Sequence, residues 1–237
     1  MTQVGAGGDD SGDRAVDAAS SPTAVDPKVL SDVIEGTFSV PGPGQRRSIR
    51  INTFIRSWMA QQCGGRGAPI DDTSERFSQD TTPDLELIRE RGFTEDYVNM
   101  FAGARRDCDA ASPGNLIDQA PTFQAWSELR SPWAEVERTV TADNRVAALR
   151  GPLAGCLEQR SGLTVSVRNP ASSYLSGVDG AADADRQRLA TIYADCGKDY
   201  FAMVETLMLE QRSEMVNRHR DILERFAVEV VSLGYTP

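Results

Sequence analysis

The sequence offers few of the residues that catalysis and cofactor binding usually require. It contains one histidine, His219, and four cysteines, none of which stands in a CxxC pair. The phosphate-binding pattern GxxxxGK[ST], the dinucleotide-binding pattern GxGxxG and the nucleophile pattern GxSxG are all missing. His219 lies between Arg218 and Arg220, whose charges disfavour a protonated imidazole and suggest a surface position. We therefore expect no cofactor and no catalytic triad built on His219.

Positive charge is also scarce. The chain has 25 lysine and arginine residues against 35 aspartate and glutamate residues, which gives a net charge of −10. Binding to nucleic acids and docking on anionic membranes both draw affinity from an excess of lysine and arginine, so both are disfavoured. The sequence has no apolar run of the roughly 18–20 residues that a membrane span needs. We expect a protein with no nucleic-acid partner and no membrane span.

The first residues contain almost nothing that could be buried. Residues 2–24 are mainly glycine, serine, alanine and aspartate, a composition that cannot offset the entropy cost of ordering the backbone. We predict a flexible leader or tether over 1–25 and a single helical domain over 26–237. The N-terminus has no basic region followed by an apolar one, so it does not read as a signal peptide. Whether the native precursor carries a lipid anchor or a signal peptide stays open.

Apolar residues recur at helical spacing along most of the remaining chain. Helix-start signals, such as Asp26 before Pro27, and glycines after the last apolar residue set the boundaries. Residues 163–169 alternate in the manner of a short strand. The patterns predict helices over 26–36, 48–67, 83–92 and 94–110, and two or three helices over 122–162, one of which starts where Ser131 caps Pro132.

The end of the chain carries the longest helical pattern. An apolar stripe runs from about Asp183 to Leu233 and is interrupted by the polar stretch 210–221. At 1.5 Å per residue, an unbroken helix of this length would measure roughly 75 Å, which exceeds the width of a domain of this size. We predict that the long C-terminal helix bends, breaks or projects within 210–221.

The four cysteines, Cys63, Cys108, Cys156 and Cys196, are far apart in the sequence. Zinc sites usually bring their ligands in close pairs and a catalytic cysteine needs a histidine base, so we expect neither a metal nor a thiol nucleophile. Two disulfides or buried free thiols remain. Of the three pairings, we favour Cys63–Cys108 and Cys156–Cys196, each contributing roughly 4 kcal/mol in the chain-entropy model. The predicted fold is mainly α, a disulfide-stapled helical domain with a long C-terminal helix.

Four short motifs accompany these cysteines: WMAQQC at 58–63, GARRDC at 103–108, GCLEQRSG at 155–162 and YADC at 193–196. Together they resemble a group of poorly characterised actinobacterial secreted proteins and lipoproteins, which have four spaced cysteines and a long C-terminal helix. This sequence departs from the group because Cys63 follows WMAQQ rather than opening the motif, and because the lipobox cysteine is missing. The resemblance implies an extracellular or cell-envelope location and disulfides, and it implies no catalytic residue.

The polar stretch 210–221 is the candidate contact surface, with Arg212, Arg218 and Arg220 as binding residues. The acidic segment 179–185 lacks the order of a calcium-binding EF-hand loop, so we expect a solvated loop there. We predict a non-enzymatic secreted or cell-envelope protein that binds a partner protein, a wall polymer or a small ligand. The alternative is an extracellular hydrolase that uses unrecognised carboxylates, which a deep pocket with two converging acids would favour.

Overall fold

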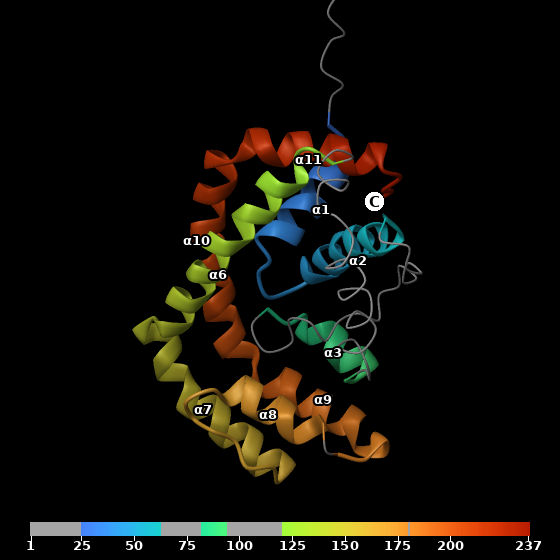
Figure 1. The fold of residues 1–237 in the computed structure, drawn as a ribbon. Coiled ribbons are helices and arrows are strands. Elements are labelled where there is room, and N and C mark those ends of the chain that lie inside the picture. The colour runs from blue at the N-terminus through green and yellow to red at the C-terminus, as the bar shows by residue number, and fades with distance from the viewer. Residues whose placement is uncertain (1–24, 63–81, 94–119, 180) are drawn as a thin grey trace, which may run out of the picture.

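The computed structural model describes residues 25–62, 82–93, 120–179 and 181–237, and these ranges contain helices and no strand (Figure 1). The prediction of a mainly α fold is therefore confirmed. The predicted leader up to residue 24 and the predicted helix at 94–110 lie outside the described residues. The helices are α1 (Pro27–Thr37), α2 (Gln45–Gln62), α3 (Leu85–Arg91), α6 (Phe123–Ala142), α7 (Asn144–Ser161), α8 (Pro170–Asp179), α9 (Asp183–Cys196), α10 (Lys198–Arg218) and α11 (Arg220–Ser232).

Local capping signals in the sequence fix several of these boundaries. The carboxylate of Asp26 accepts a hydrogen bond from the backbone N–H of Lys28 at 2.8 Å and starts α1. Asp84 does the same for the N–H of Leu87 at 3.0 Å and starts α3. Gly162 ends α7 in the left-handed conformation, with a φ of 79° that favours glycine. These ends lie close to where the sequence predicts them.

Two of the local predictions are wrong. Pro132 lies inside α6 rather than at the start of a helix, because a continuous stripe of buried side chains on both sides of it outweighs the lost backbone hydrogen bond. Residues 163–169 form no strand, because side chains take the backbone donors of this segment. Glu158 accepts the N–H of Val165 and Ser173 accepts the N–H of Ser166, both at 2.9 Å.

The C-terminal pattern forms three successive helices instead of one long helix. The chain turns at His219, within the predicted interval 210–221, so that α11 crosses the end of α10 (Figure 1). A second change of direction occurs at Gly197, between α9 and α10, outside the interval 210–221 in which the break is predicted. Helix α10 therefore runs along the molecule and connects two groups of helices: α1, α2, α6 and α11 at one end, and α3, α7, α8 and α9 at the other.

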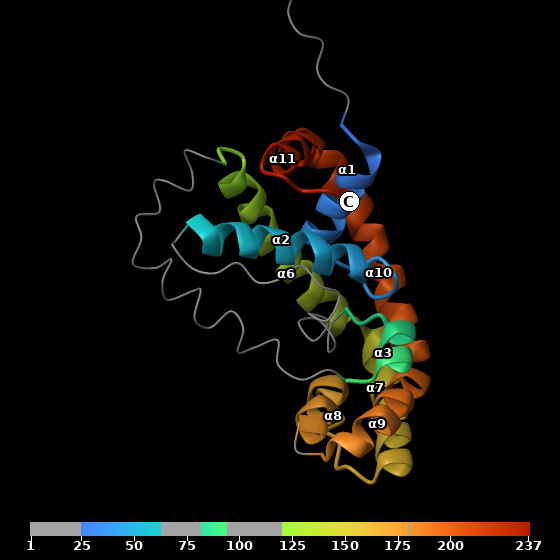
Figure 2. The same cartoon turned by 90° about the vertical axis from the view of Figure 1, so that its right-hand side faces the viewer.

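Each group of helices has its own aromatic cluster. At the α11 end, Trp126 stacks on Phe226 with ring centroids 4.6 Å apart, and its indole N–H donates to the hydroxyl of Thr37 at 2.5 Å. At the α9 end, Tyr174 stacks on Tyr193 at 5.7 Å. All of these rings are buried, so they belong to the core of the protein. Figure 2 shows α2 crossing the molecule beside α1.

Gly197 is required by the packing of the neighbouring turns. A Cβ atom at this position would lie 2.9 Å from the carbonyl oxygen of Tyr193 and 2.9 Å from a ring carbon of Phe201. The carbonyl belongs to the backbone and the ring is buried, so neither can move away without disturbing the core. Gly155 in α7 provides a contrast, because a Cβ atom there would meet nothing within 4 Å.

We predict opposite effects of the same substitution at these two glycines. Gly197→Ala should lower the free energy of unfolding by about 1–3 kcal/mol, because the added methyl group overpacks the core. Gly155→Ala should raise it by about 0.5–1 kcal/mol, because alanine loses less backbone entropy in a helix. Urea denaturation of both variants measures the difference, and a stabilised Gly197→Ala variant would contradict the close contact.

Candidate functional site

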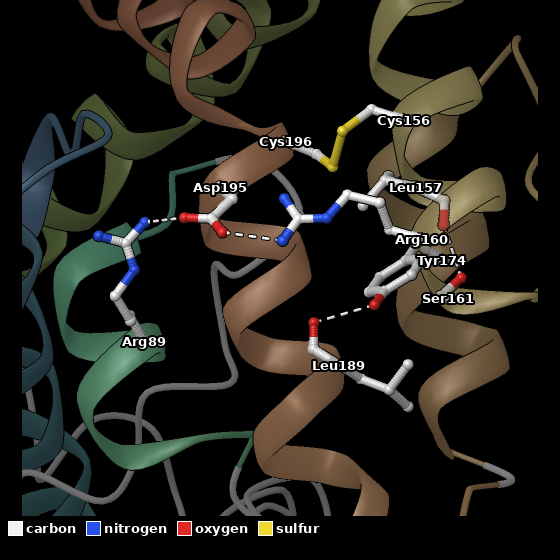
Figure 3. Close-up of a disulfide and its surroundings, with 9 residues drawn as sticks. All are labelled: Arg89, Cys156, Leu157, Arg160, Ser161, Tyr174, Leu189, Asp195 and Cys196. Atoms are coloured by element: carbon white, nitrogen blue, oxygen red, sulfur yellow. Dashed lines mark hydrogen bonds and ion pairs between the residues drawn. A yellow bond between two sulfur atoms is a disulfide. The ribbon is translucent and has the colours of Figure 1, made fainter.

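A disulfide joins Cys156 of α7 to Cys196 at the end of α9, with the two Cα atoms 5.8 Å apart (Figure 3). This bond confirms one of the two predicted pairs and closes a sequence separation of 40 residues. The other predicted pair, Cys63–Cys108, lies outside the described residues. The disulfide holds α7 against α9 at the point where the chain leaves α9 for α10.

A cluster of charged side chains lies directly beside this disulfide. The carboxylate of Asp195 accepts a hydrogen bond from a terminal nitrogen of Arg160 at 3.0 Å through one oxygen, and from Arg89 through the other. Figure 3 shows the carboxylate between the two guanidinium groups, which reach it from α7 and α3. We call Arg89, Arg160, Asp195 and Lys198 the Asp195 cluster. The hydrogen bond from Arg160 lowers the pKa of Asp195 most, and the charges of Arg89, Arg160 and Lys198 lower it further.

The disulfide accounts for the geometry of this cluster. Asp195 directly precedes Cys196, and Arg160 follows Cys156 by four residues, so it lies one turn further along the same face of α7. Once the two sulfur atoms are joined, the guanidinium of Arg160 and the carboxylate of Asp195 are brought within reach of each other. The cysteines can be identified from the sequence, whereas Arg160 and Asp195 cannot, because neither stands out by type or spacing.

Tyr174 is a buried residue of α8 that bonds to the backbone of α9, below the Asp195 cluster in Figure 3. Its hydroxyl donates to the backbone carbonyl oxygen of Leu189 at 2.9 Å, and its ring lies fully buried between α8 and α9. Burial raises the pKa of Tyr174 to about 12, and the nearby charges of Arg188 and Arg160 oppose this shift. The tyrosine therefore stays neutral over the whole physiological range and acts as packing.

A second charged cluster lies at the junction of α1, α2 and α10. The carboxylate of Glu35 accepts hydrogen bonds from Arg47 at 3.1 Å and from Arg212 at 2.8 Å. The Glu35 side chain is only 5% exposed, so these two contacts replace the water that the carboxylate loses on burial. Burial raises the pKa of neighbouring Glu205, which Arg212 opposes and Glu35 reinforces. A Cβ atom at Gly44 would lie 2.6 Å from the Glu35 carboxylate, so a larger residue there would push this carboxylate out of its position.

This geometry corrects the expected exposure of one of the three candidate binding arginines. A contact residue has to be accessible, but the side chain of Arg212 is only 18% exposed because it pairs with Glu35. Arg218 and Arg220 are exposed, on either side of the turn at His219. Arg218 pairs with Glu214, and Arg220 pairs with Glu224 at 3.3 Å, each four residues away along its helix. The structure therefore does not bring the three arginines together on one surface.

The other buried acids in the described part of the chain also have partners. Asp32 accepts a hydrogen bond from the hydroxyl of Tyr235 at 2.6 Å, and Asp84 accepts one from Arg46 at 3.1 Å. Within the same residues, no group of three or more histidine, cysteine or acidic side chains could hold a metal ion. None of the helices that the structure describes is long and apolar enough to cross a membrane. The buried carboxylates of the described residues are thus engaged in contacts that hold helices together.

We predict that Arg212 and Arg218 differ strongly in their effect on stability. Arg212→Ala should lower the free energy of unfolding by about 3 kcal/mol, because it leaves the buried Glu35 carboxylate with one partner. Arg218→Ala should lower it by at most about 0.5 kcal/mol, because an exposed pair within one helix contributes little. Thermal denaturation of the two variants provides the comparison, and equal shifts in melting temperature would be inconsistent with the Glu35 contact.

We also predict a local effect of removing the disulfide. Replacing Cys156 and Cys196 together by serine should lower the free energy of unfolding by up to about 4 kcal/mol, because the unfolded chain regains the entropy of the open loop. Amide hydrogen exchange should accelerate in α7 and α9, while α1 and α11 act as internal controls that change less. Uniform acceleration across all helices would show that the disulfide does not act locally.

Comparison with known proteins gives no match for this chain. No protein-family model, no curated protein and no solved structure matches it significantly. The resemblance to actinobacterial secreted proteins and lipoproteins therefore stays a prediction that depends on four short cysteine motifs. A function for the chain has to be argued from its own residues, namely the disulfide, the two charged clusters and the exposed surface of α10 and α11.

Proposed function

We propose that this protein is a non-enzymatic protein of the cell envelope or the extracellular medium, where it binds a partner protein, a wall polymer or a small ligand. The Cys156–Cys196 disulfide is the observation that carries this proposal. Structural disulfides persist in oxidising compartments and are rare in the cytosol, where thiols are kept reduced. A lipid anchor on the native precursor would keep such a protein at the envelope.

The state of the carboxylates supports a binding role over the alternative of an extracellular hydrolase. A hydrolase that works through two carboxylates needs an acid and a base that face the substrate. In the described part of the chain, the buried acids Asp32, Glu35 and Asp84 all bond to tyrosine or arginine within the fold. The single histidine, His219, lies at the turn between α10 and α11.

The surface that we propose for the partner is the corner where α10 meets α11. Arg218 and Arg220 are exposed there, and Val228 and Val231, about two to three turns further along α11, are among the large apolar side chains that remain exposed. The proposed surface therefore extends from the corner along α11, and exposed apolar groups on such a surface are typical of a contact between proteins. Arg212 contributes to this corner only indirectly, because its contact with Glu35 holds α10 against α1.

Thiol trapping in native cells tests this proposal. The cells are alkylated before lysis and then separated into cytosolic, envelope and medium fractions, and the full-length protein is digested and analysed by mass spectrometry. We expect the protein in the envelope or medium fraction, with Cys156 and Cys196 unmodified because they are disulfide-bonded. Recovery from the cytosol with both cysteines alkylated would contradict the proposal.

A second arm of the same experiment tests the binding surface. The variant Arg218→Ala/Arg220→Ala should keep the melting temperature of the native protein, because both arginines are exposed. If the corner holds a partner in the envelope, a larger share of this variant should be released by washing. Arg145→Ala, which removes an exposed arginine of α7 that pairs with Asp143, is the matched control. Equal release of both variants would argue against the corner.

A further inference from the structure

The Asp195 cluster has more donors than its single carboxylate can use. Arg89 and Arg160 each contact Asp195 through one terminal nitrogen, and the structure shows no other partner for either guanidinium among the described residues. The two side chains are 39% and 44% exposed, so their remaining N–H groups are open to solvent. Lys198, in the first turn of α10, adds an exposed ammonium group.

The charges of the cluster do not balance. Two guanidinium groups share one carboxylate, which leaves one positive charge in excess, in a chain whose net charge is −10. Lys198 is followed directly by Asp199, so these two residues together add no net charge. The charged groups that act on Asp195 are all cations: Arg89, Arg160 and Lys198. The carboxylate therefore neutralises only one of the two guanidinium groups, and the charge of the other is available to an anion.

The cluster is also held in place before any ligand arrives. The disulfide fixes α7 against α9, and Asp195 spaces the guanidinium groups of Arg89 and Arg160 on its two sides (Figure 3). Arg89 is further anchored through its backbone, because its carbonyl oxygen accepts a hydrogen bond from the side chain of Gln187 at 2.8 Å. Preorganised arginines lose less entropy on binding than free ones do.

We propose that the Asp195 cluster binds a phosphate group, carried by inorganic phosphate, by a small phosphorylated molecule or by a phosphate-containing polymer. Guanidinium groups present pairs of N–H donors that match the oxygens of phosphate. Arg89 and Arg160 would bind the oxygens and Lys198 would add its ammonium group. This proposal goes beyond the proposed function, because it names a ligand class and lies away from the α10–α11 corner, and it holds wherever the protein is located.

Isothermal titration calorimetry on the oxidised full-length protein tests the proposal, with inorganic phosphate, glycerol 3-phosphate and a soluble poly(glycerol phosphate) as separate probes. We expect saturable binding of at least one probe at matched ionic strength in chloride. If the polymer binds more tightly per phosphate group than glycerol 3-phosphate does, the natural ligand is a polymer. If the two bind equally per phosphate group, the natural ligand is a small molecule. Acetate should bind at least about tenfold more weakly than phosphate, because it offers one charge and two oxygens.

The variants assign the binding to the cluster. Arg89→Gln and Arg160→Gln should each weaken phosphate binding at least about tenfold, since each removes a charged pair of donors. Arg225→Gln, which removes an exposed arginine that pairs with Asp221, should leave binding unchanged. Lys198→Gln, at an exposed side chain, should weaken binding about threefold and serves as the test where an arginine variant fails to fold. No saturable binding up to about 50 mM phosphate, or equal weakening by Arg225→Gln, would overturn the proposal.

Discussion

The covalent bond between α7 and α9 is the constraint on which the arrangement of α3, α7, α8 and α9 depends. Cys196 is the last residue of α9, and the chain continues into α10 through Gly197, where Phe201 leaves no room for a side chain. The disulfide therefore fixes both α7 and the start of α10 at one point. Because Asp195 and Arg160 lie next to the two cysteines along their helices, their ion pair is set by the same bond.

The two ends of the molecule use the same kind of ionic contact in different ways. In each, one carboxylate lies between two arginines from other helices: Glu35 joins α1, α2 and α10, and Asp195 joins α3, α7 and α9. Glu35 is buried, so its arginines compensate for the loss of water and serve stability. Asp195 is 32% exposed, so water already screens the pair, and its arginines can turn spare donors toward a ligand.

The sequence predicts the local features of this fold better than the contacts between distant segments. The capping residues Asp26 and Asp84 and the glycine at 162 act on neighbouring backbone groups, so their roles can be predicted directly. The turn at Gly197 depends on the ring of Phe201 packing over it, which helical periodicity does not reveal. The pairing of Glu35 with Arg212 spans 177 residues, so Arg212 could not be separated from its exposed neighbours by pattern alone.

The disulfide thus links location, stability and the candidate ligand site. The pKa of Asp195 reports on this link, because the hydrogen bond from Arg160 is the main cause that keeps it low. A titration followed by NMR of the Asp195 carboxyl carbon, in the oxidised protein and after replacement of Cys156 and Cys196 by serine, measures it directly. The account predicts a low pKa in the oxidised protein that rises toward the ordinary value of about 3.9 when the disulfide is removed. The same pKa in both proteins would contradict it, because the ion pair would then form without the covalent bond.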